Sequence, residues 1–308
     1  MPKNLKYYLK KAQKEKWAIG QFNFSDPSQL EGIVEAAKDL ESPIILGTSE
    51  GESRFLGLKQ AVALKKSYQV EKGFPIFLNL DHGKSFEYLK KAIELGYDMV
   101  HFDGSKLSLK ENISQTKEIV KYAKKFSVLV EGEVGAIGNE SSKIYKEKFV
   151  IKPEDLTNPQ EAAKYVRETR VDCLAVNIGS FHGVSVQGNP KLDLERLKQI
   201  KKAVYPVKSS KAGISPKAKL FNGVKNVFLV LHGGSGTPDR DVKKSIELGI
   251  RKININTELR MAYTETLKES FKVHPEEITP YKYLPNAIKA VQKVVEGKIL
   301  LFGSKNKI

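Results

Sequence analysis

Eight short apolar runs alternate with longer amphipathic segments along the chain, and this alternation is the strongest constraint on its fold. The runs predict strands at 18–24, 43–48, 74–80, 98–103, 127–133, 172–179, 226–231 and 250–256. Helical patterns lie between them, as in Pro27–Leu40, where apolar or small residues recur every three or four positions. Strands that alternate with helices form parallel sheets, and eight parallel strands close into a barrel. The sequence therefore predicts an α/β fold, a (β/α)8 TIM barrel.

The helix boundaries carry signals of their own. Ser85 and Ser108 precede helical patterns as expected N-caps, and Gly249 follows another pattern as a stop signal. The eighth helix is expected to start near Thr257, and residues 281–296 predict an additional C-terminal helix. Because such a barrel takes about 250 residues as one domain, residues 1–308 are predicted to form a single domain.

Two long polar segments interrupt the alternation. Residues 135–158 follow the fifth strand, on the rim where a barrel builds its active site, so this segment is a predicted lid. Residues 208–225 form a basic insertion before the seventh strand, which places them on the opposite rim. We expect this insertion to be structural or disordered.

The net charge of +16 raises the question of a nucleic-acid partner. Lysine is spread over nearly every helical segment, however, and only 208–225 is a local basic cluster, so a solvated basic surface is the preferred interpretation. A positive potential also raises the encounter rate with a phosphorylated substrate.

The sequence shows no targeting or membrane segment. No run of about 18 apolar residues predicts a membrane span, and the lysine-rich N terminus does not resemble a signal peptide. The single cysteine, Cys173, lies in an apolar run and is expected to be a core residue. A cytoplasmic protein is predicted.

Three of the five histidines end an apolar run and precede a glycine: His82, His182 and His232. Glycine makes up 23 of the 308 residues, so three His–Gly pairs are not expected from composition. In a barrel these strand ends share one rim, where the three imidazoles would face a common point. Three protein ligands and an open position are what a catalytic zinc requires. His101, inside the fourth strand, and His274 lack these features and are left out of the predicted site.

The sequence around these histidines resembles a known family, the class II, zinc-dependent fructose-1,6-bisphosphate aldolases and the related tagatose-bisphosphate aldolases. The similarity runs nearly end to end through GQFNF (20–24), TSEG (48–51), LDHG (80–83), FDGS (102–105), VEGEVG (130–135), IGSFHG (178–183), LHGGSG (231–236), NINTELR (254–260) and the closing LLFGSKNKI.

The resemblance implies a catalytic centre. His82, His182 and His232 would be the ligands of the catalytic zinc, and Asp103 and Glu133 match acidic residues near an alternative position of the divalent metal. Asp81 matches the catalytic acid/base, and Asn254 is expected to hydrogen-bond the enediolate. In the family a monovalent-cation requirement and a dimeric or tetrameric assembly are common.

The resemblance also implies two phosphate-binding regions. Gly233 and Ser235, in a glycine-rich turn that leads to a helix start, form a natural anion site. The other matching positions that hold the dihydroxyacetone phosphate half are Gly183, Asn254, Asn256 and Thr257. Ser49 and Arg260 match positions near the second phosphate, with Arg260 expected from a neighbouring subunit.

Two departures from the family pattern affect substrate binding. Many relatives carry a phosphate-binding lysine four residues after the second histidine, but this chain has Val186 there, and Lys191 does not simply replace it. Asn256 stands where some fructose-bisphosphate enzymes carry aspartate and tagatose enzymes carry alanine. A polar side chain favours the fructose substrate and leaves tagatose 1,6-bisphosphate as the alternative.

The expected reaction is a reversible aldol cleavage of fructose 1,6-bisphosphate, as in glycolysis and gluconeogenesis. A Schiff-base aldolase would need a lysine inside the barrel, and Lys252, the one lysine within a predicted strand, is expected near the strand start and away from the catalytic rim. A non-catalytic barrel that binds nucleic acid is the alternative from another class. Asp81 beside His82 argues against it and leaves nucleic acid at most a secondary partner.

Overall fold

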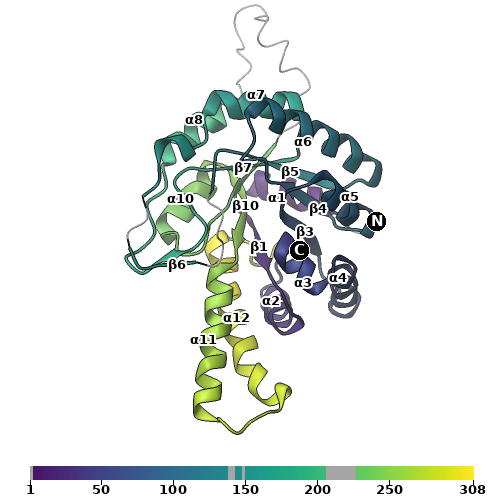
Figure 1. Cartoon of the computed structure of the whole chain (residues 1–308), viewed down its shortest axis with the longest axis vertical. Coiled ribbons are helices and arrows are strands. Elements are labelled where there is room, and N and C mark those ends of the chain that lie inside the picture. The colour runs from purple at the N-terminus through teal and green to yellow at the C-terminus, as the bar shows by residue number, and fades with distance from the viewer. Residues whose placement is uncertain (1–2, 138–142, 148–149, 206–226) are drawn as a thin grey trace, which may run out of the picture.

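The structure, a computed structural model, describes residues 3–137, 143–147, 150–205 and 227–308 (Figure 1). Eight parallel strands close into a barrel in the order β1-β10-β9-β7-β5-β4-β3-β2, which confirms the predicted fold. The strands are β1 (Ile19–Asn23), β2 (Ile44–Ser49), β3 (Ile76–Gly83), β4 (Met99–Phe102), β5 (Leu129–Val134), β7 (Cys173–Val176), β9 (Phe228–Leu231) and β10 (Ile250–Ile255).

Helices surround this barrel. They are α1 (Leu5–Glu15), α2 (Pro27–Asp39), α3 (Glu50–Leu56), α4 (Leu58–Lys72), α5 (Phe86–Leu95), α6 (Leu109–Ala123), α7 (Pro159–Thr169), α8 (Leu194–Val204), α10 (Asp239–Leu248), α11 (Thr257–Val273) and α12 (Pro280–Phe302). The predicted caps of α5 and α6 are confirmed, because the Ser85 and Ser108 side chains accept hydrogen bonds from Tyr88 N and Glu111 N. No helix in the described ranges is both long and apolar enough to cross a lipid bilayer.

Helix α1, which was not among the expected helices, packs against the apolar lower part of the barrel interior. Leu5 and Leu9 belong to one buried cluster with Phe77 and Met99 from the strands, and Cys173 is buried in the same cluster, as predicted. This cluster fills the interior below the polar residues of the site.

The C-terminal helix packs along the outside of the barrel. Helix α12 lies against α2 and α11, and Figure 1 shows α11 and α12 side by side, projecting from the barrel as a hairpin. The additional C-terminal helix is therefore confirmed, and it is longer than the predicted 281–296.

The two long connections differ in what the structure describes. Within 135–158, a short strand β6 (Ile144–Tyr145) pairs with β8 (Val184–Ser185), and a 3-10 turn η2 spans Pro153–Asp155. This segment is thus tied to the loop that follows His182, although its role as a lid stays a prediction. The basic insertion at 208–225 lies outside the described residues.

The α2–α12 contact depends on a glycine. A Cβ on Gly32 would lie 2.5 Å from the Ile288 carbonyl oxygen and 3.1 Å from Val291 Cβ, whereas a Cβ on Gly297 in α12 meets nothing within 4 Å. We expect Gly32→Ala to lower the free energy of unfolding by about 1–3 kcal/mol through overpacking. The matched Gly297→Ala should raise it by about 0.5–1 kcal/mol through helix propensity. Urea unfolding measures both, and equal shifts of the two midpoints would contradict this packing.

Candidate active site

A cavity of about 190 Å³ opens at the carboxyl ends of the barrel strands, the rim where TIM barrels carry their active sites. It brings together most of the residues singled out in the sequence. Those that line it are Ser49, Asp81, His82, Asp103, His182, Gly183, Gly233, Ser235, Asn254, Asn256 and Thr257. His232 and Glu133 are buried directly behind this surface, and Arg260 does not line the cavity.

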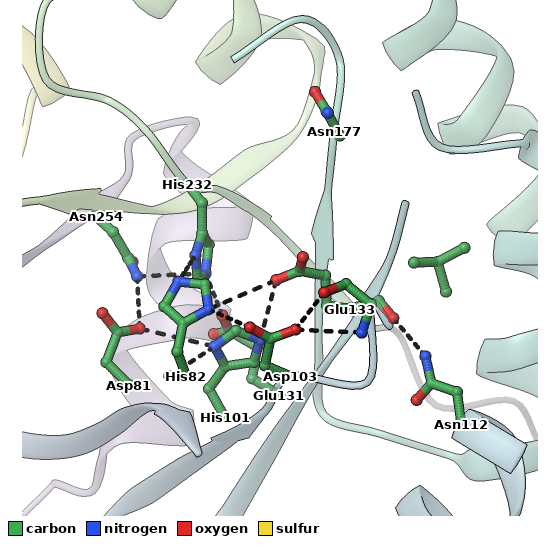
Figure 2. A network of polar contacts seen from close by, with 12 residues as sticks. Asp81, His82, His101, Asp103, Asn112, Glu131, Glu133, Asn177, His232 and Asn254 are labelled. Atoms are coloured by element: carbon green, nitrogen blue, oxygen red, sulfur yellow. Dashed lines mark hydrogen bonds and ion pairs between the residues drawn. The ribbon is translucent and has the colours of Figure 1, made fainter. Parts of the chain in front are cut away.

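Two of the predicted histidines, His82 and His232, face each other, and each also contacts a carboxylate through its other ring nitrogen (Figure 2). His82 Nδ1 lies 3.0 Å from Asp103 Oδ2, and His232 Nε2 lies 2.7 Å from Glu131 Oε1. Because a carboxylate only accepts, each of these ring nitrogens carries the proton. The remaining nitrogens, His82 Nε2 and His232 Nδ1, are 3.0 Å apart. Their lone pairs therefore point at the same place.

The third predicted histidine lies beside this pair, but the donor atoms that gather around the pair closely enough to hold an ion come from Asp81, His82, His101 and His232. The ring of His182 lies 4.6 Å from that of His82 and 5.8 Å from that of His232, centroid to centroid. Two imidazole nitrogens that share a tetrahedral zinc at Zn–N about 2.0–2.1 Å lie roughly 3.3 Å apart. The facing pair is close to that spacing, and carboxylate-held imidazoles are usual around such metals. The donor set thus fits a divalent ion.

The backbone at His82 is strained. His82 has a φ of +49°, a left-handed conformation unusual for a residue other than glycine. Its N–H donates to His101 Nδ1 at 3.1 Å, and the His101 ring is fully buried against the rings of His82 and His232. Leaving His101 out of the site was therefore wrong. Residues two apart on a strand point to the same side, so an inward-facing Met99 predicts that the His101 side chain also points into the barrel. This spacing is the signal that could have identified His101.

Lys252 also lies elsewhere than predicted. It is completely buried inside the barrel, and its Nζ donates to Glu131 Oε2 at 2.9 Å and to Asn254 Oδ1 at 2.8 Å. The expected distance from the site was wrong, because the long side chain reaches the site from the middle of β10. An ammonium paired with a buried carboxylate is a poor nucleophile, so this contact does not favour Schiff-base chemistry.

Glu131 was missed in the sequence although it lies two residues before Glu133 on the same strand. Burial alone would raise its pKa, but the Lys252 charge and the hydrogen bond with His232 hold the pKa of Glu131 well below its usual range. Burial lowers the pKa of His232 despite Glu131. Glu131 is therefore ionised and His232 neutral, and a neutral imidazole is the form that can bind a metal.

Asp81 is held in place by two amides. Its Oδ2 accepts from Asn23 Nδ2 at 3.0 Å, and its Oδ1 accepts from Asn254 Nδ2 at 3.1 Å. Burial would raise the pKa of Asp81, but the charge of protonated His82 and the contact with His101 bring it well below its ordinary value. The carboxylate is thus ionised, oriented and at the cavity surface.

Glu133 and His101 carry buried atoms that lack a hydrogen bond. Glu133 Oε2 and His101 Nε2 lie 3.3 Å apart, and neither makes a hydrogen bond to the residues that the structure describes. Glu133 Oε2 is also 4.0 Å from His82 Nδ1, beside Asp103. Donor atoms of His82, Asp103 and Glu133 gather closely enough to hold an ion, and the orphaned oxygen of Glu133 fits that reading.

One side of the cavity is built from glycine-rich turns. Gly183 and Gly233 have φ values of +126° and +62°, and a Cβ on Gly233 would lie 2.3 Å from the Phe181 carbonyl oxygen. Asn189, which the sequence analysis did not single out, donates to the carbonyls of Gly183 and Ser235 at 3.2 and 2.8 Å and so joins the two turns.

The helix start that lines this side is that of α11. Asn256 and Thr257, at its first turn, line the cavity, and Ser235 Oγ accepts from Glu258 N at 3.3 Å. The expected turn thus faces α11, instead of the helix that follows Pro238. A helix N terminus beside open glycine backbone suits an anion.

The other side is organised by Glu52, a buried residue that the sequence did not reveal. Its Oε2 accepts from Ser49 N at 2.7 Å and Asn23 Nδ2 at 3.0 Å. Its Oε1 accepts from Asn256 Nδ2 at 3.2 Å and from the Arg260 guanidinium of the same chain. The arginine is therefore held against Glu52. Neither Val186 nor Lys191 lines the cavity.

Comparisons with known proteins agree with this geometry. The family model described as fructose-bisphosphate aldolase class-II matches residues 3–307. The chain is 35% identical over 301 residues to a probable fructose-bisphosphate aldolase from Bacillus subtilis, covering 97% of this chain and 96% of that protein. It is 35% identical over 302 residues to a sulfofructosephosphate aldolase from Alkalicoccus urumqiensis, with coverage of 98% and 96%. The crystal structure of the YdjI aldolase from Escherichia coli K12 superposes with a TM-score of 0.79 at 29% identity, covering 100% of this chain and 99% of that one.

Metal uptake at this site should depend on pH through His82. Burial by itself lowers the pKa of His82, but the Asp81 carboxylate and the hydrogen bond to Asp103 raise it above the ordinary 6.5. A metal must displace this proton, so its affinity should be constant above the raised pKa and fall about tenfold per pH unit below it. Asp103→Asn should move the onset to lower pH, and the exposed Asp239→Asn should not. Competition with a chromophoric chelator measures this, and an onset unmoved by Asp103→Asn would contradict the assignment.

Proposed function

Because the chain belongs to the class II fructose-bisphosphate aldolase family, whose members are metal-dependent carbon–carbon lyases, we propose that it is a zinc-dependent aldolase that reversibly cleaves fructose 1,6-bisphosphate. The products would be dihydroxyacetone phosphate and glyceraldehyde 3-phosphate. One observation carries the proposal. The nitrogens of His82 and His232, each oriented by a carboxylate, face each other at 3.0 Å, and His82 lines the same cavity as Asp81.

His82, His182 and His232 would hold the zinc ion. When bound, zinc supplies a Lewis acid that draws electron density from the ketose carbonyl, a contribution of several kcal/mol, roughly, to transition-state stabilisation. The carboxylates behind the rings, Asp103 and Glu131, accept the protons on the far nitrogens and so hold the imidazoles in one tautomer and one orientation. Asp103 and Glu133 would offer an alternative position for a divalent ion, as their shared donor cluster with His82 suggests.

Asp81 would act as the acid/base. In the cleavage direction the ionised carboxylate takes the proton of the C4 hydroxyl as the C3–C4 bond breaks, and in condensation it returns this proton. Asn254 lies beside it, with its amide oxygen occupied by Lys252 and its N–H₂ turned toward Asp81. Asn254 Nδ2 also lies 3.3 Å from His232 Nε2, whose proton points to Glu131. We propose that the second N–H of Asn254 donates to the enediolate oxygen of the dihydroxyacetone phosphate half when substrate is bound.

The two sides of the cavity would bind the two ends of the substrate. Gly183, Gly233, Ser235 and Thr257 offer backbone and hydroxyl donors at the start of α11, which supports binding of the phosphate of the dihydroxyacetone half. Asn256 would contact the sugar hydroxyls on this side. Ser49 and Arg260 belong to the other side, which we assign to the second phosphate.

The assembly is also a proposal. We propose a homodimer or homotetramer in which a neighbouring subunit contributes near Arg260. Exposed apolar side chains on the projecting hairpin support it, because Ile278 and Tyr281 are 87% and 78% exposed. A phosphorylated sugar is the expected substrate. One domain over residues 1–308, a cytoplasmic location and a monovalent cation stay predictions.

Two substitutions should separate metal binding from proton transfer. His182→Ala should lose bound zinc and cleavage together, because it removes one of three ligands. Asp81→Ala, or the isosteric Asp81→Asn, should keep zinc but lose turnover by about 10²–10⁴-fold. Zinc content by atomic absorption and cleavage in a coupled assay measure both. Near-normal turnover of Asp81→Ala would show that Asp81 is not the acid/base.

The substrate itself can be tested directly. The zinc-loaded protein should cleave fructose 1,6-bisphosphate with a higher kcat/KM than tagatose 1,6-bisphosphate, because we expect polar Asn256, held by Glu52, to contact the sugar. A coupled assay for the triose phosphates, run with both substrates, measures this preference. Equal or inverted values would favour the tagatose-bisphosphate reaction.

A further inference from the structure

One lysine in the cavity has no assigned role. Lys84 follows directly on β3, two residues after His82, and lines the same cavity as the histidines. Among the cavity-lining residues that the structure describes, it is the one lysine or arginine. Its backbone N–H donates to Glu50 Oε2 at 3.2 Å, which ties the position of the residue to the first turn of α3.

The barrel order places Lys84 opposite the glycine-rich turns. In the closed ring, β3 lies four strands away from β9, and β2 lies four strands away from β7. The turn with Gly183 follows β7, and the turn with Gly233 follows β9. On the other side, Lys84 directly follows β3, and Ser49 is the last residue of β2. A substrate whose one phosphate lies in the glycine-rich turns therefore extends across the histidines toward Lys84.

The charges at this side leave Lys84 available. Within the described parts of the chain, its ammonium makes no hydrogen bond or ion pair. Glu50, the acidic neighbour at the cavity surface, is paired with Arg54 at 2.7 Å. Arg260 is bound to the buried Glu52 and does not line the cavity. A terminal anion that reaches this side therefore meets the Lys84 ammonium at the cavity surface, whereas Arg260 could contribute only from outside the residues that line the cavity.

We propose that Lys84 is a specificity-determining residue, whose ammonium binds the terminal anionic group of the substrate on the side opposite the glycine-rich turns. This proposal rests on the proposed aldolase function. A compact ammonium on a flexible stem binds a phosphate as a point charge and does not require one geometry. The same contact serves a sulfonate or a carboxylate at that position, so Lys84 selects for an anionic terminus as a class.

The test compares two substrates that differ only in the terminal phosphate, fructose 1,6-bisphosphate and fructose 1-phosphate. Lys84→Met should lower the ratio of their kcat/KM values by about 10- to 100-fold, the loss expected for one charge-assisted hydrogen bond. Lys84→Arg should restore most of the ratio because it keeps the charge. Lys91→Met, an exposed lysine on α5 without a polar partner among the described residues, is the matched control and should keep the wild-type ratio.

The outcomes separate this inference from the proposed function. Wild-type protein that neither cleaves the bisphosphate nor exchanges the C3 proton of dihydroxyacetone phosphate would refute the aldolase assignment itself. If wild-type protein does both, an unchanged ratio in Lys84→Met would overturn the role of Lys84. An equal fall of kcat/KM for both substrates would also overturn it, because it would indicate a structural effect.

Discussion

The site depends on two imidazole nitrogens that are forced to face each other inside a barrel. Asp103 and Glu131 fix the protons on the far sides of His82 and His232, so the near sides present lone pairs 3.0 Å apart. Two lone pairs at that distance repel each other, so the contact needs a positive charge between them, either the proton that the raised pKa of His82 favours or a metal ion in its place. The geometry thus favours a positive charge between these two nitrogens, and Asp81 and Asn254 lie beside it.

This arrangement needs a water-poor interior with balanced charge. Glu131 could not be ionised there without Lys252, because transfer of a lone carboxylate from water costs several kcal/mol. Below this polar layer, the apolar cluster that α1 joins fills the barrel interior. Above it, the strand ends place Asp81, Asp103 and Glu133 at the rim. The interior therefore has three layers, an apolar one, a charge-paired one and, at the rim, the layer of the proposed catalytic residues. Alternate residues along a strand supply successive layers.

The two sides of the cavity, which we propose bind the two phosphates, are built by different means. The glycine-rich turns after β7 and β9 use backbone and the start of α11, joined by Asn189. The side after β2 and β3 uses side chains, in which Glu52 binds Ser49, Asn256 and Arg260 at once. Glu52 also reaches Asp81 through Asn23. The proposed phosphate-binding side is thus linked by hydrogen bonds to the residue proposed for proton transfer.

The sequence alone determined the barrel, its rim and the three histidines on it, because strand and helix periodicity and the His–Gly pairs are local patterns that survive without knowledge of the fold. It did not reveal His101, Glu131, Glu52 or Asn189, and it misplaced Lys252. Each of these acts through contacts with residues far away in the chain, such as Glu131 with Lys252 and Glu52 with Arg260. Only the closed barrel decides which of its polar side chains point inward and contact one another. These contacts depend on strand register and on side-chain length, and neither can be deduced from the local spacing of residues in the sequence.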